Sequence, residues 1–468
     1  METASAHHSQ WLAHEIESES NLASAIVIGG GMAGLLAARV LTERFDRVWV
    51  VDRDHFEADA RIRAGVPQAR HAHALLAGGR NVVNELFPGL EADLISKGAM
   101  PVDWGADFAI HTAAGWMPRA STGVISFGCS RALLESSIRA RLMKDPRVRF
   151  IEGCDVSGLI VDDEKRVSGV RLRKRDSSTK KNIERAELVV DASGRSSHAP
   201  KWLVDLGYSL VEETTIDSCR AYASRWYEQP SGSRGWKAML HATWAPNETR
   251  GGLIYPVEDD RWCVTLSGAG LDYPPTDDAG FLDFARRQPT PLIYEAIRDA
   301  RPVSPIHGFR RLENRRRHFE RMKNWPAGFI VIGDAMCAFN PVFAQGMSVS
   351  ALGAMTLRRC LRAHDPRDPR FGRSFQRALA RTNAAPWFMT TTEDLRWSVT
   401  EGAPCTWKHR LAQRYLDHVS GLASESPRIN RLNLEVWHLV KPPWMLLNPM
   451  MAVEPLRRRI RQATSQMM

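Results

Sequence analysis

A glycine-rich turn between an apolar strand and a helix constrains the fold of this chain more than any other feature. Residues 24–54 read SAIVIGGGMAGLLAARVLTERFDRVWVVDRD. The apolar run before the glycines predicts a buried strand, the periodic run after them predicts a helix, and the second apolar run predicts another strand. The chain therefore opens on a βαβ unit and belongs to the α/β (α+β) class.

The glycines in this turn have the spacing of a dinucleotide-binding site. Gly29, Gly31 and Gly34 form GxGxxG, and Asp52 ends the second strand 52 − 34 = 18 residues later. The first glycine permits the tight turn, the second lets the backbone approach a pyrophosphate, and the third packs the helix on the strand. The helix N-terminus favours the phosphates, and Asp52 accepts hydrogen bonds from a ribose. The neighbouring residues predicted to contact the cofactor are Met32, Ala33 and Arg53.

A second glycine-led helix lies far along the chain, after the apolar run GFIVI (328–332). The stretch GFIVIGDAMCAFNPVFAQGM (328–347) resembles the second FAD fingerprint of the p-hydroxybenzoate-hydroxylase-like flavoprotein monooxygenases. This resemblance implies that Asp334 binds the ribityl chain and that Pro341 shapes a loop against the flavin. It also implies that the amides of Gly346 and Met347 face flavin nitrogen 1, where a helix dipole stabilises the anionic reduced form.

Three more stretches resemble the same family and complete its expected FAD site. In RIRAGV (61–66) the resemblance implies that Arg63 reaches the pyrophosphate while Gly65 and Val66 border the isoalloxazine. SRALLE (130–135), a helix start with Ser and Glu at capping positions, implies a cofactor contact for Arg131, although a surface arginine is an alternative. DASGRSS (191–197) resembles the family's Asp-Gly motif. The remaining cofactor residues in this expectation are His71, Asp155, Val156 and Asp191.

A closer resemblance adds a substrate class. GVPQARHAHALLAGG (65–79), CSRALLE (129–135), PVEDDRWCVTLSG (256–268) and GDAMCAFNPVFAQGMS (333–348) look like the polyether-antibiotic epoxidases of the lasalocid and monensin type. There, a flavin hydroperoxide epoxidises alkenes of a linear polyketide. This implies an apolar, polyketide or terpenoid, natural-product substrate and O2. The chain departs from the wider hydroxylase pattern at Ser348, where an Asn is usual, and in having DASG.

Other functions remain open. An aromatic hydroxylase would share the FAD motifs but would need a group that deprotonates a phenol, for which Tyr222 and Arg225 are candidates. A prenyl-lipid reductase or a non-catalytic flavin-binding protein would also show DASG, whereas the WxWxIP signature of flavin halogenases is absent. Trp226 and Trp262 fit an apolar substrate pocket, and filling the core of a sheet is their alternative role.

Electron supply and metal binding are less constrained. The chain has one intact GxGxxG and no visible second unit that would hold NADPH permanently. Either NAD(P)H binds transiently, or a separate flavin reductase delivers electrons. His71 and His73 are two residues apart with no carboxylate-rich partner segment, so we expect loop residues beside the flavin and no metal site. The net charge of +10 comes without a nucleic-acid-binding motif, so we expect no nucleic-acid partner.

Composition and pattern complete the expected organisation. Seven scattered cysteines without a CxxC pair favour a reducing cytoplasm. No apolar window is long enough to span a membrane, but the basic run LRRRIRQ after residues 441–456 leaves peripheral membrane contact open. We expect a mobile leader (1–22), a discontinuous FAD-binding domain (23–205 and 305–365), an inserted antiparallel-sheet substrate domain (206–304) and a helical C-terminal region (366–468).

Overall fold

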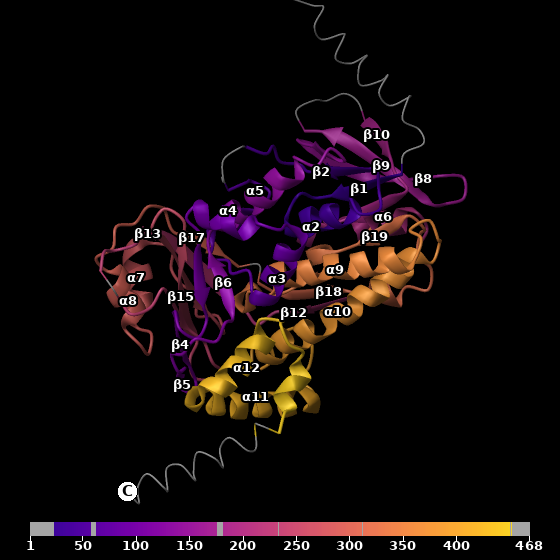
Figure 1. Ribbon diagram of the computed structural model, residues 1–468. Coiled ribbons are helices and arrows are strands. Elements are labelled where there is room, and N and C mark those ends of the chain that lie inside the picture. The colour runs from indigo at the N-terminus through magenta and orange to yellow at the C-terminus, as the bar shows by residue number, and fades with distance from the viewer. Residues whose placement is uncertain are drawn as a thin grey trace, which may run out of the picture.

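Five parallel strands form the sheet that carries the predicted βαβ unit, in the order β19-β11-β1-β2-β7 (Figure 1). The computed structural model describes residues 23–57, 62–175, 181–232, 234–310, 312–449 and 451. In β1, Val27 pairs with Val50 on one side and Val190 on the other. Both faces of the sheet are covered, which explains the continuous apolar runs. The strands are β1 (Ser24–Ile28), β2 (Arg47–Val51), β7 (Val148–Ile151), β11 (Leu188–Asp191) and β19 (Phe329–Val331).

Helices from both ends of the chain pack around this sheet, and together they confirm the α/β class. Helix α9 contacts α2, α3 and α10, although several hundred residues separate α2 from α9. Their buried aliphatic faces join the strands in one hydrophobic core. The helices of this layer are α2 (Met32–Leu41), α3 (Ala77–Leu86), α4 (Leu90–Ser96), α5 (Arg131–Leu142), α6 (Ala199–Asp205), α9 (Gly346–Ala363) and α10 (Phe371–Asp394).

A small sheet of three antiparallel strands lies at one end of the molecule, at the top of Figure 1. They are β8 (Cys154–Val161), β9 (Val167–Lys174) and β10 (Lys181–Arg185). Each strand pairs with the next in the chain, in the order β10-β9-β8. The sequence pattern at 155–191 predicts a short antiparallel meander that returns to the parallel sheet, and β8 and β9 are two of its strands. Its third strand is wrong in that prediction, because β10 is formed by residues 181–185, most of which read as a polar turn, while the apolar residues 188–191 form β11 of the parallel sheet.

A seven-stranded sheet forms the second large unit, in the order β17-β13-β16-β15-β14-β4-β5. Helices α7 (Asp278–Arg286) and α8 (Leu292–Ile297) pack against β15 and β16 in this sheet. Its strands are β4 (Phe108–Thr112), β5 (Gly115–Trp116), β13 (Ala221–Glu228), β14 (Ala238–His241), β15 (Arg250–Val257), β16 (Arg261–Gly268) and β17 (His307–Phe309).

The structure corrects the predicted boundaries of this second unit. Strand β4 pairs in parallel with β14, so residues 108–116 belong to this sheet and not to the FAD-binding segment. Conversely, β12 (Glu213–Ile216) pairs with β18 (Asn314–Arg317), which also pairs with β20 (Cys337–Ala338). Strand β3 (Met100–Asp103) pairs with β6 (Ile125–Gly128). Local sequence pattern predicts a strand but not its distant partner, which is why the boundaries were misplaced.

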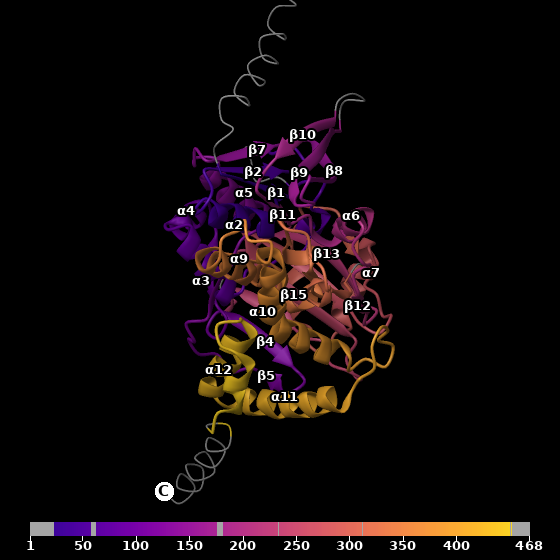
Figure 2. The ribbon, with the colours of Figure 1, turned by 90° about the vertical axis from the view of Figure 1, so that its right-hand side faces the viewer.

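The C-terminal helices lie at the end of the molecule away from β10 (Figure 2). Helix α11 (Trp407–Glu425) packs on α12 (Pro427–Trp437), and the short helix η6 (Pro443–Leu447) follows. Their buried residues pack together with strands β4, β14 and β15. Within the described residues, no helix combines the length and apolar character needed to cross a membrane.

A buried histidine of the C-terminal region, His438, is hydrogen-bonded to α3. We expect the protein to become less stable in acid because of this residue. The Nδ1 of His438 accepts from the Ala77 amide at 3.1 Å, and burial lowers the pKa of His438 to about 3. The unfolded chain, with an ordinary histidine pKa near 6.5, therefore binds the proton first as pH falls. We expect this residue to reduce the free energy of unfolding by about 2 kcal/mol between pH 7 and pH 5.

Denaturant titrations at the two pH values measure this effect. His438→Gln keeps an acceptor for the Ala77 amide but cannot titrate, so its stability should depend less on pH in this window. An unchanged slope in the variant would show that His438 does not contribute.

Candidate active site

A cavity of about 820 Å³ lies at the carboxyl ends of the parallel strands. Its wall includes residues directly after β1, β2 and β11, and Asp334 just beyond β19. Ligands of open parallel sheets bind at this edge, where helices begin next to strand ends. We call it the strand-end cavity.

The first glycine turn opens on this cavity. Gly29 has φ +103°, and a Cβ there would lie 2.6 Å from the Ala192 carbonyl oxygen. A Cβ on Gly34 would lie 1.8 Å from the Gly29 carbonyl oxygen, so only glycine allows α2 to pack this closely. A Cβ on Gly31 would meet nothing within 4 Å, and no side chain caps the helix. The first amides of α2 therefore remain available to an anion in open space.

The second glycine-led helix opens on the same cavity. Helix α9 begins at Gly346 without a side-chain cap, and a Cβ on Gly346 would also meet nothing within 4 Å. Pro341 and Met347 line the cavity on either side of this helix start. The two uncapped helices begin 346 − 32 = 314 residues apart in the chain, and both helix starts line the same cavity.

A cluster of charged side chains holds the loop that contains Arg63. The Arg63 guanidinium lies 3.4 Å from Asp52, 3.3 Å from Asp54 and 3.1 Å from Glu135. These carboxylates raise the pKa of Arg63 against the effect of its burial. Asp52 also accepts from the Gly30 amide at 2.6 Å, so it orders the glycine turn as well as lining the cavity.

The structure corrects the predicted capping role of Glu135. Ser130 caps α5 by accepting from the Leu133 amide, as the sequence predicts. Glu135 instead accepts from Arg131 at 2.8 Å and from Arg63. It lies five residues after the cap, beyond the position from which a side chain reaches back to the helix start.

A buried polar network supports the loop before α9. Asn340 accepts from the Val342 amide at 3.1 Å, and its own amide group donates to both oxygens of Asp394 at 3.1 and 2.9 Å. Asp394 lies at the end of α10 with none of its surface exposed. It also accepts from Ser218 at 2.8 Å and from Asn314 at 2.6 Å, and Arg220 lies 3.4 Å away. The helical C-terminal region thereby fixes a loop of the cavity.

His71 lines the cavity and is held from the second sheet. Its Nδ1 lies 2.8 Å from Ser224 Oγ, which lies 2.7 Å from Thr265 Oγ1. Burial lowers the pKa of His71 to about 4, so the ring is neutral at pH 7. His73 Nδ1 lies 2.9 Å from the His71 carbonyl oxygen. Within the described part of the chain, no group of three or more His, Cys, Asp or Glu could hold a metal ion.

Seventeen of the nineteen predicted cofactor residues line the strand-end cavity. The exceptions are Gly34, which packs α2 on β1, and Asp191, which is fully buried. Asp191 accepts from Ser193 and Ser197 hydroxyls at 2.5 Å and so shapes the turn after β11. The residues that line the cavity are Gly29, Gly31, Met32, Ala33, Asp52, Arg53, Arg63, Gly65, Val66, His71, Arg131, Asp155, Val156, Asp334, Pro341, Gly346 and Met347.

The predicted substrate-pocket residues are divided between the two faces of the second sheet. Tyr222 lines the cavity. Arg225 donates to the Ser304 carbonyl and pairs with Asp278, and Trp262 packs in the core beneath α7 and α8. Trp226 donates to the Arg70 carbonyl at 3.0 Å. Arg225, Trp226 and Trp262 are therefore not part of the cavity wall.

Several lining residues were missed by the sequence analysis, including Phe309, Phe339 and Trp202. Phe309 lies on the edge strand β17, and Trp202 lies on α6. Neither belongs to a motif with a fixed spacing. Phe339 lies within the second fingerprint stretch, next to Asn340, so its position could have been inferred from that motif.

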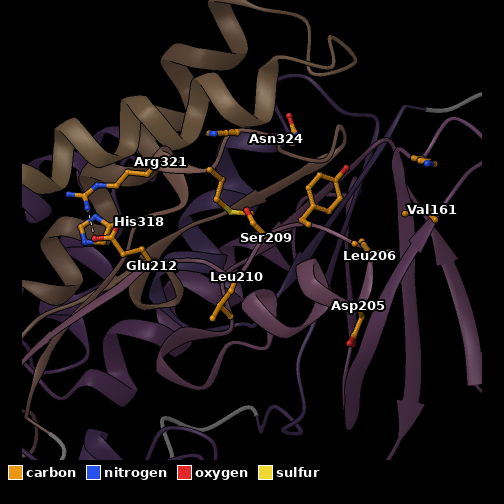
Figure 3. Close-up of a pocket in the computed structure, with 14 residues that line it drawn as sticks. Val161, Asp205, Leu206, Ser209, Leu210, Glu212, His318, Arg321 and Asn324 are labelled. Carbon is orange, nitrogen blue, oxygen red and sulfur yellow. Dashed lines mark hydrogen bonds and ion pairs between the residues drawn. The ribbon is translucent and has the colours of Figure 1, made fainter.

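A second cavity, of about 1060 Å³, lies near the short helix η3 (Phe319–Arg321) (Figure 3). Arg321 pairs there with Glu212 at 2.5 Å, and the His318 ring lies beside them. Apart from Asp205, its lining residues are not shared with the strand-end cavity. It lacks the glycine turns and uncapped helix starts that define the first cavity.

Two comparisons with known proteins give matches over most of the chain. Residues 23–364 match the model of a family described as FAD binding domain. The chain is 30% identical over 434 residues to Protein Rv3254 of Mycobacterium tuberculosis, covering 90% of each chain.

Solved structures share the fold at low identity. The flavin-dependent brominase Bmp2 is 15% identical, with a TM-score of 0.62 and coverage of 93% of this chain and 99% of the brominase. PqsL, a probable FAD-dependent monooxygenase from Pseudomonas aeruginosa, is 16% identical, with a TM-score of 0.58 and coverage of 80% and 93%. At this identity the likeness concerns the fold.

Proposed function

The chain belongs to the FAD-binding domain family, a family of monooxygenase-type flavoproteins, and from this premise we propose that it epoxidises an alkene. The substrate is an apolar natural-product intermediate of the polyketide or terpenoid class. The reaction balances as alkene + O2 + NAD(P)H + H⁺ → epoxide + H2O + NAD(P)⁺. One oxygen atom of O2 enters the alkene and the other leaves as water, while NAD(P)H supplies two electrons directly or through a flavin reductase.

The residues of the strand-end cavity fit FAD. The open space at Gly31 would accommodate a pyrophosphate against the α2 amides, and the space at Gly346 would accommodate the flavin ring against α9. Asp334 would accept hydrogen bonds from the ribityl chain and Asp52 from the ribose. Bound FAD, once reduced, supplies the activation of O2. The protein holds the cofactor, orients the alkene and excludes water.

The observation that favours an alkene over a phenol is the lack of a suitable base among the predicted candidates. Burial raises the pKa of Tyr222 far above that of a phenol in water, and Arg225 pairs with Asp278 outside the cavity wall. His71, with a pKa of about 4, is a weak base. Phenol hydroxylation needs the substrate oxygen to lose its proton, whereas an alkene needs no base.

Labelled oxygen tests this proposal. The purified protein is incubated with FAD, a flavin reductase, NAD(P)H and ¹⁸O2, and it is offered a linear polyene or a phenol. We expect one ¹⁸O atom in an epoxide of the polyene by mass spectrometry. Label in a catechol would instead identify a phenol hydroxylase, and oxidation of neither substrate would favour a reductase or a flavin-binding protein without this activity.

Tyr222→Phe gives a sharper test of the same point. The Tyr222 hydroxyl makes no hydrogen bond within the described residues, so its removal should leave FAD affinity and epoxide formation within about twofold of the wild type. A large loss of turnover with FAD binding unchanged would show that the hydroxyl takes part in the chemistry. Steady-state kinetics and titration of FAD fluorescence separate the two effects.

A further inference from the structure

An unusually apolar surface lies at the C-terminal end of the molecule. Among the described residues, five large hydrophobic side chains are more than 60% exposed, and four of them form two pairs in the C-terminal region. Trp407 and Leu411 lie on α11, and Trp444 and Leu447 lie on η6. Burying such side chains is favourable, so a concentration of them on one surface indicates a docking site.

The two elements are in direct contact. The Tyr415 hydroxyl on α11 donates to the Leu446 carbonyl oxygen on η6 at 2.7 Å. Tyr415 follows Leu411 by one helical turn, so η6 contacts α11 one turn beyond Leu411. We call this surface the α11 face; it comprises Trp407, Lys408, Arg410, Leu411, Arg414, Trp444 and Leu447.

The α11 face is basic as well as apolar. The first eight residues of α11, Trp407 to Arg414, contain Lys408, Arg410 and Arg414 and no acidic residue. Asp417, farther along the helix, pairs with Arg396 at 2.9 Å. The sequence after the described residues also contains LRRRIR (456–461), which adds four arginines close to η6 in the chain. Tryptophan and leucine flanked by cations are typical of helices that lie in the plane of a membrane.

The position of α11 makes this contact sterically accessible. Figures 1 and 2 both show α11 as the outermost element at its end of the molecule, opposite β10. A flat surface can therefore approach α11 without meeting the FAD-binding sheet or the seven-stranded sheet.

We propose that the α11 face docks on an anionic lipid bilayer, with Trp407, Leu411, Trp444 and Leu447 entering the interface and the cations contacting lipid phosphates. This inference is independent of the alkene proposal, because it concerns the surface of α11 and η6 and not the strand-end cavity. Three cations on two helical turns match the negative surface of such a bilayer.

Vesicle sedimentation of the full-length holoprotein tests the proposal. Vesicles of phosphatidylcholine alone are compared with vesicles in which a quarter of the lipid is phosphatidylglycerol. We expect binding to the anionic vesicles, with a partition coefficient at least tenfold lower for neutral ones, and weaker binding as salt concentration rises.

Paired variants separate this face from the general basic charge of the protein. Trp407→Ser with Leu411→Ser keeps every charge, and Lys408→Glu with Arg414→Glu keeps both apolar side chains. Each pair should lower partitioning at least tenfold, while the control Leu210→Ser with Leu271→Ser, which alters exposed leucines elsewhere, should not. Thermal melting and FAD content establish that the variants are folded.

Three results would overturn the proposal. The first is that the protein does not bind anionic vesicles. The second is that the Trp407→Ser, Leu411→Ser variant binds as well as the wild type. The third is that light scattering shows a dimer for the wild type and a monomer for this variant. The second result would show that overall charge carries the binding, or that residues 452–468 cover the face. The third would show that a second copy of the chain occupies it.

Discussion

We expect the Gly34→Ala variant not to form a stable protein that binds FAD. The new Cβ would lie 1.8 Å from the Gly29 carbonyl oxygen. The backbone fixes the position of the Cβ, and the oxygen is itself a backbone atom, so neither can rotate away. Either α2 moves off β1 or the turn that holds Gly29 opens. We expect a loss of more than about 3 kcal/mol in the free energy of unfolding, since the clash involves backbone and not a flexible side chain. Denaturant unfolding of the apoprotein measures it.

Substitutions of two other glycines separate an effect on folding from an effect on FAD binding. Gly421 lies within α11, and a Cβ there would meet nothing within 4 Å, so Gly421→Ala should stabilise the protein by about 0.5–1 kcal/mol through helix propensity. Gly31 has φ −84°, which alanine adopts readily, and open space at Cβ. Gly31→Ala should fold normally but bind FAD at least tenfold more weakly, because its methyl group enters the space proposed for the pyrophosphate.

These three variants distinguish the fold from the cofactor site. If Gly34→Ala were as stable as the wild type, the close packing of α2 on β1 would be wrong. If Gly31→Ala bound FAD normally, the pyrophosphate would lie elsewhere, although the fold would stand. Fluorescence titration with FAD measures the affinity of each folded variant.

Asp394→Ala is expected to have the second-largest effect. The substitution leaves Arg220 buried without its carboxylate and removes the acceptor of the Asn314 and Asn340 amides. Removing one partner of a buried ion pair costs about 3–5 kcal/mol, because the remaining charge stays desolvated. Since Asn340 orders the loop before α9, we also expect FAD affinity to fall at least tenfold in any folded fraction.

A milder change in the same network separates these two effects. Ser218→Ala removes one hydrogen bond to Asp394 but leaves both hydrogen bonds from Asn340, and should cost about 1 kcal/mol with FAD affinity unchanged. Asp299→Ala, at an exposed position, should change neither quantity. Normal stability of Asp394→Ala would mean that Arg220 finds another partner, and normal FAD binding would mean that the loop does not need Asn340 to be anchored.

The network also explains how the C-terminal region contributes to the site. Asp394 is the last residue of α10, and its partners Ser218, Asn314 and Asn340 come from segments before β13, in β18 and before α9. One carboxylate therefore joins the FAD-binding unit to the segment that leads into β13 of the seven-stranded sheet. A change in α10 is expected to reach the cavity through this residue.

Local sequence determined the parts of the fold that depend on neighbouring residues. The βαβ unit was predictable because glycines at 29, 31 and 34 follow an apolar strand, and the second strand ends on Asp52. A positive φ at Gly29 and the contact of Gly34 with Gly29 are requirements of one short turn. The second glycine-led helix was predictable from its small and apolar residues and from the family resemblance of residues 328–347, and most residues of both motifs line one cavity.

Which distant segments meet depends on how the whole chain packs. The pairing of β4 with β14 moved residues 108–116 into the second sheet, and strand alternation placed Tyr222 at the cavity but Arg225 and Trp262 elsewhere. Asp394 had no recognisable motif, because its role depends on three partners brought together by folding. Short-range pattern fixes φ, ψ and burial along one element, whereas pairing between elements depends on loop closure and packing over the whole chain.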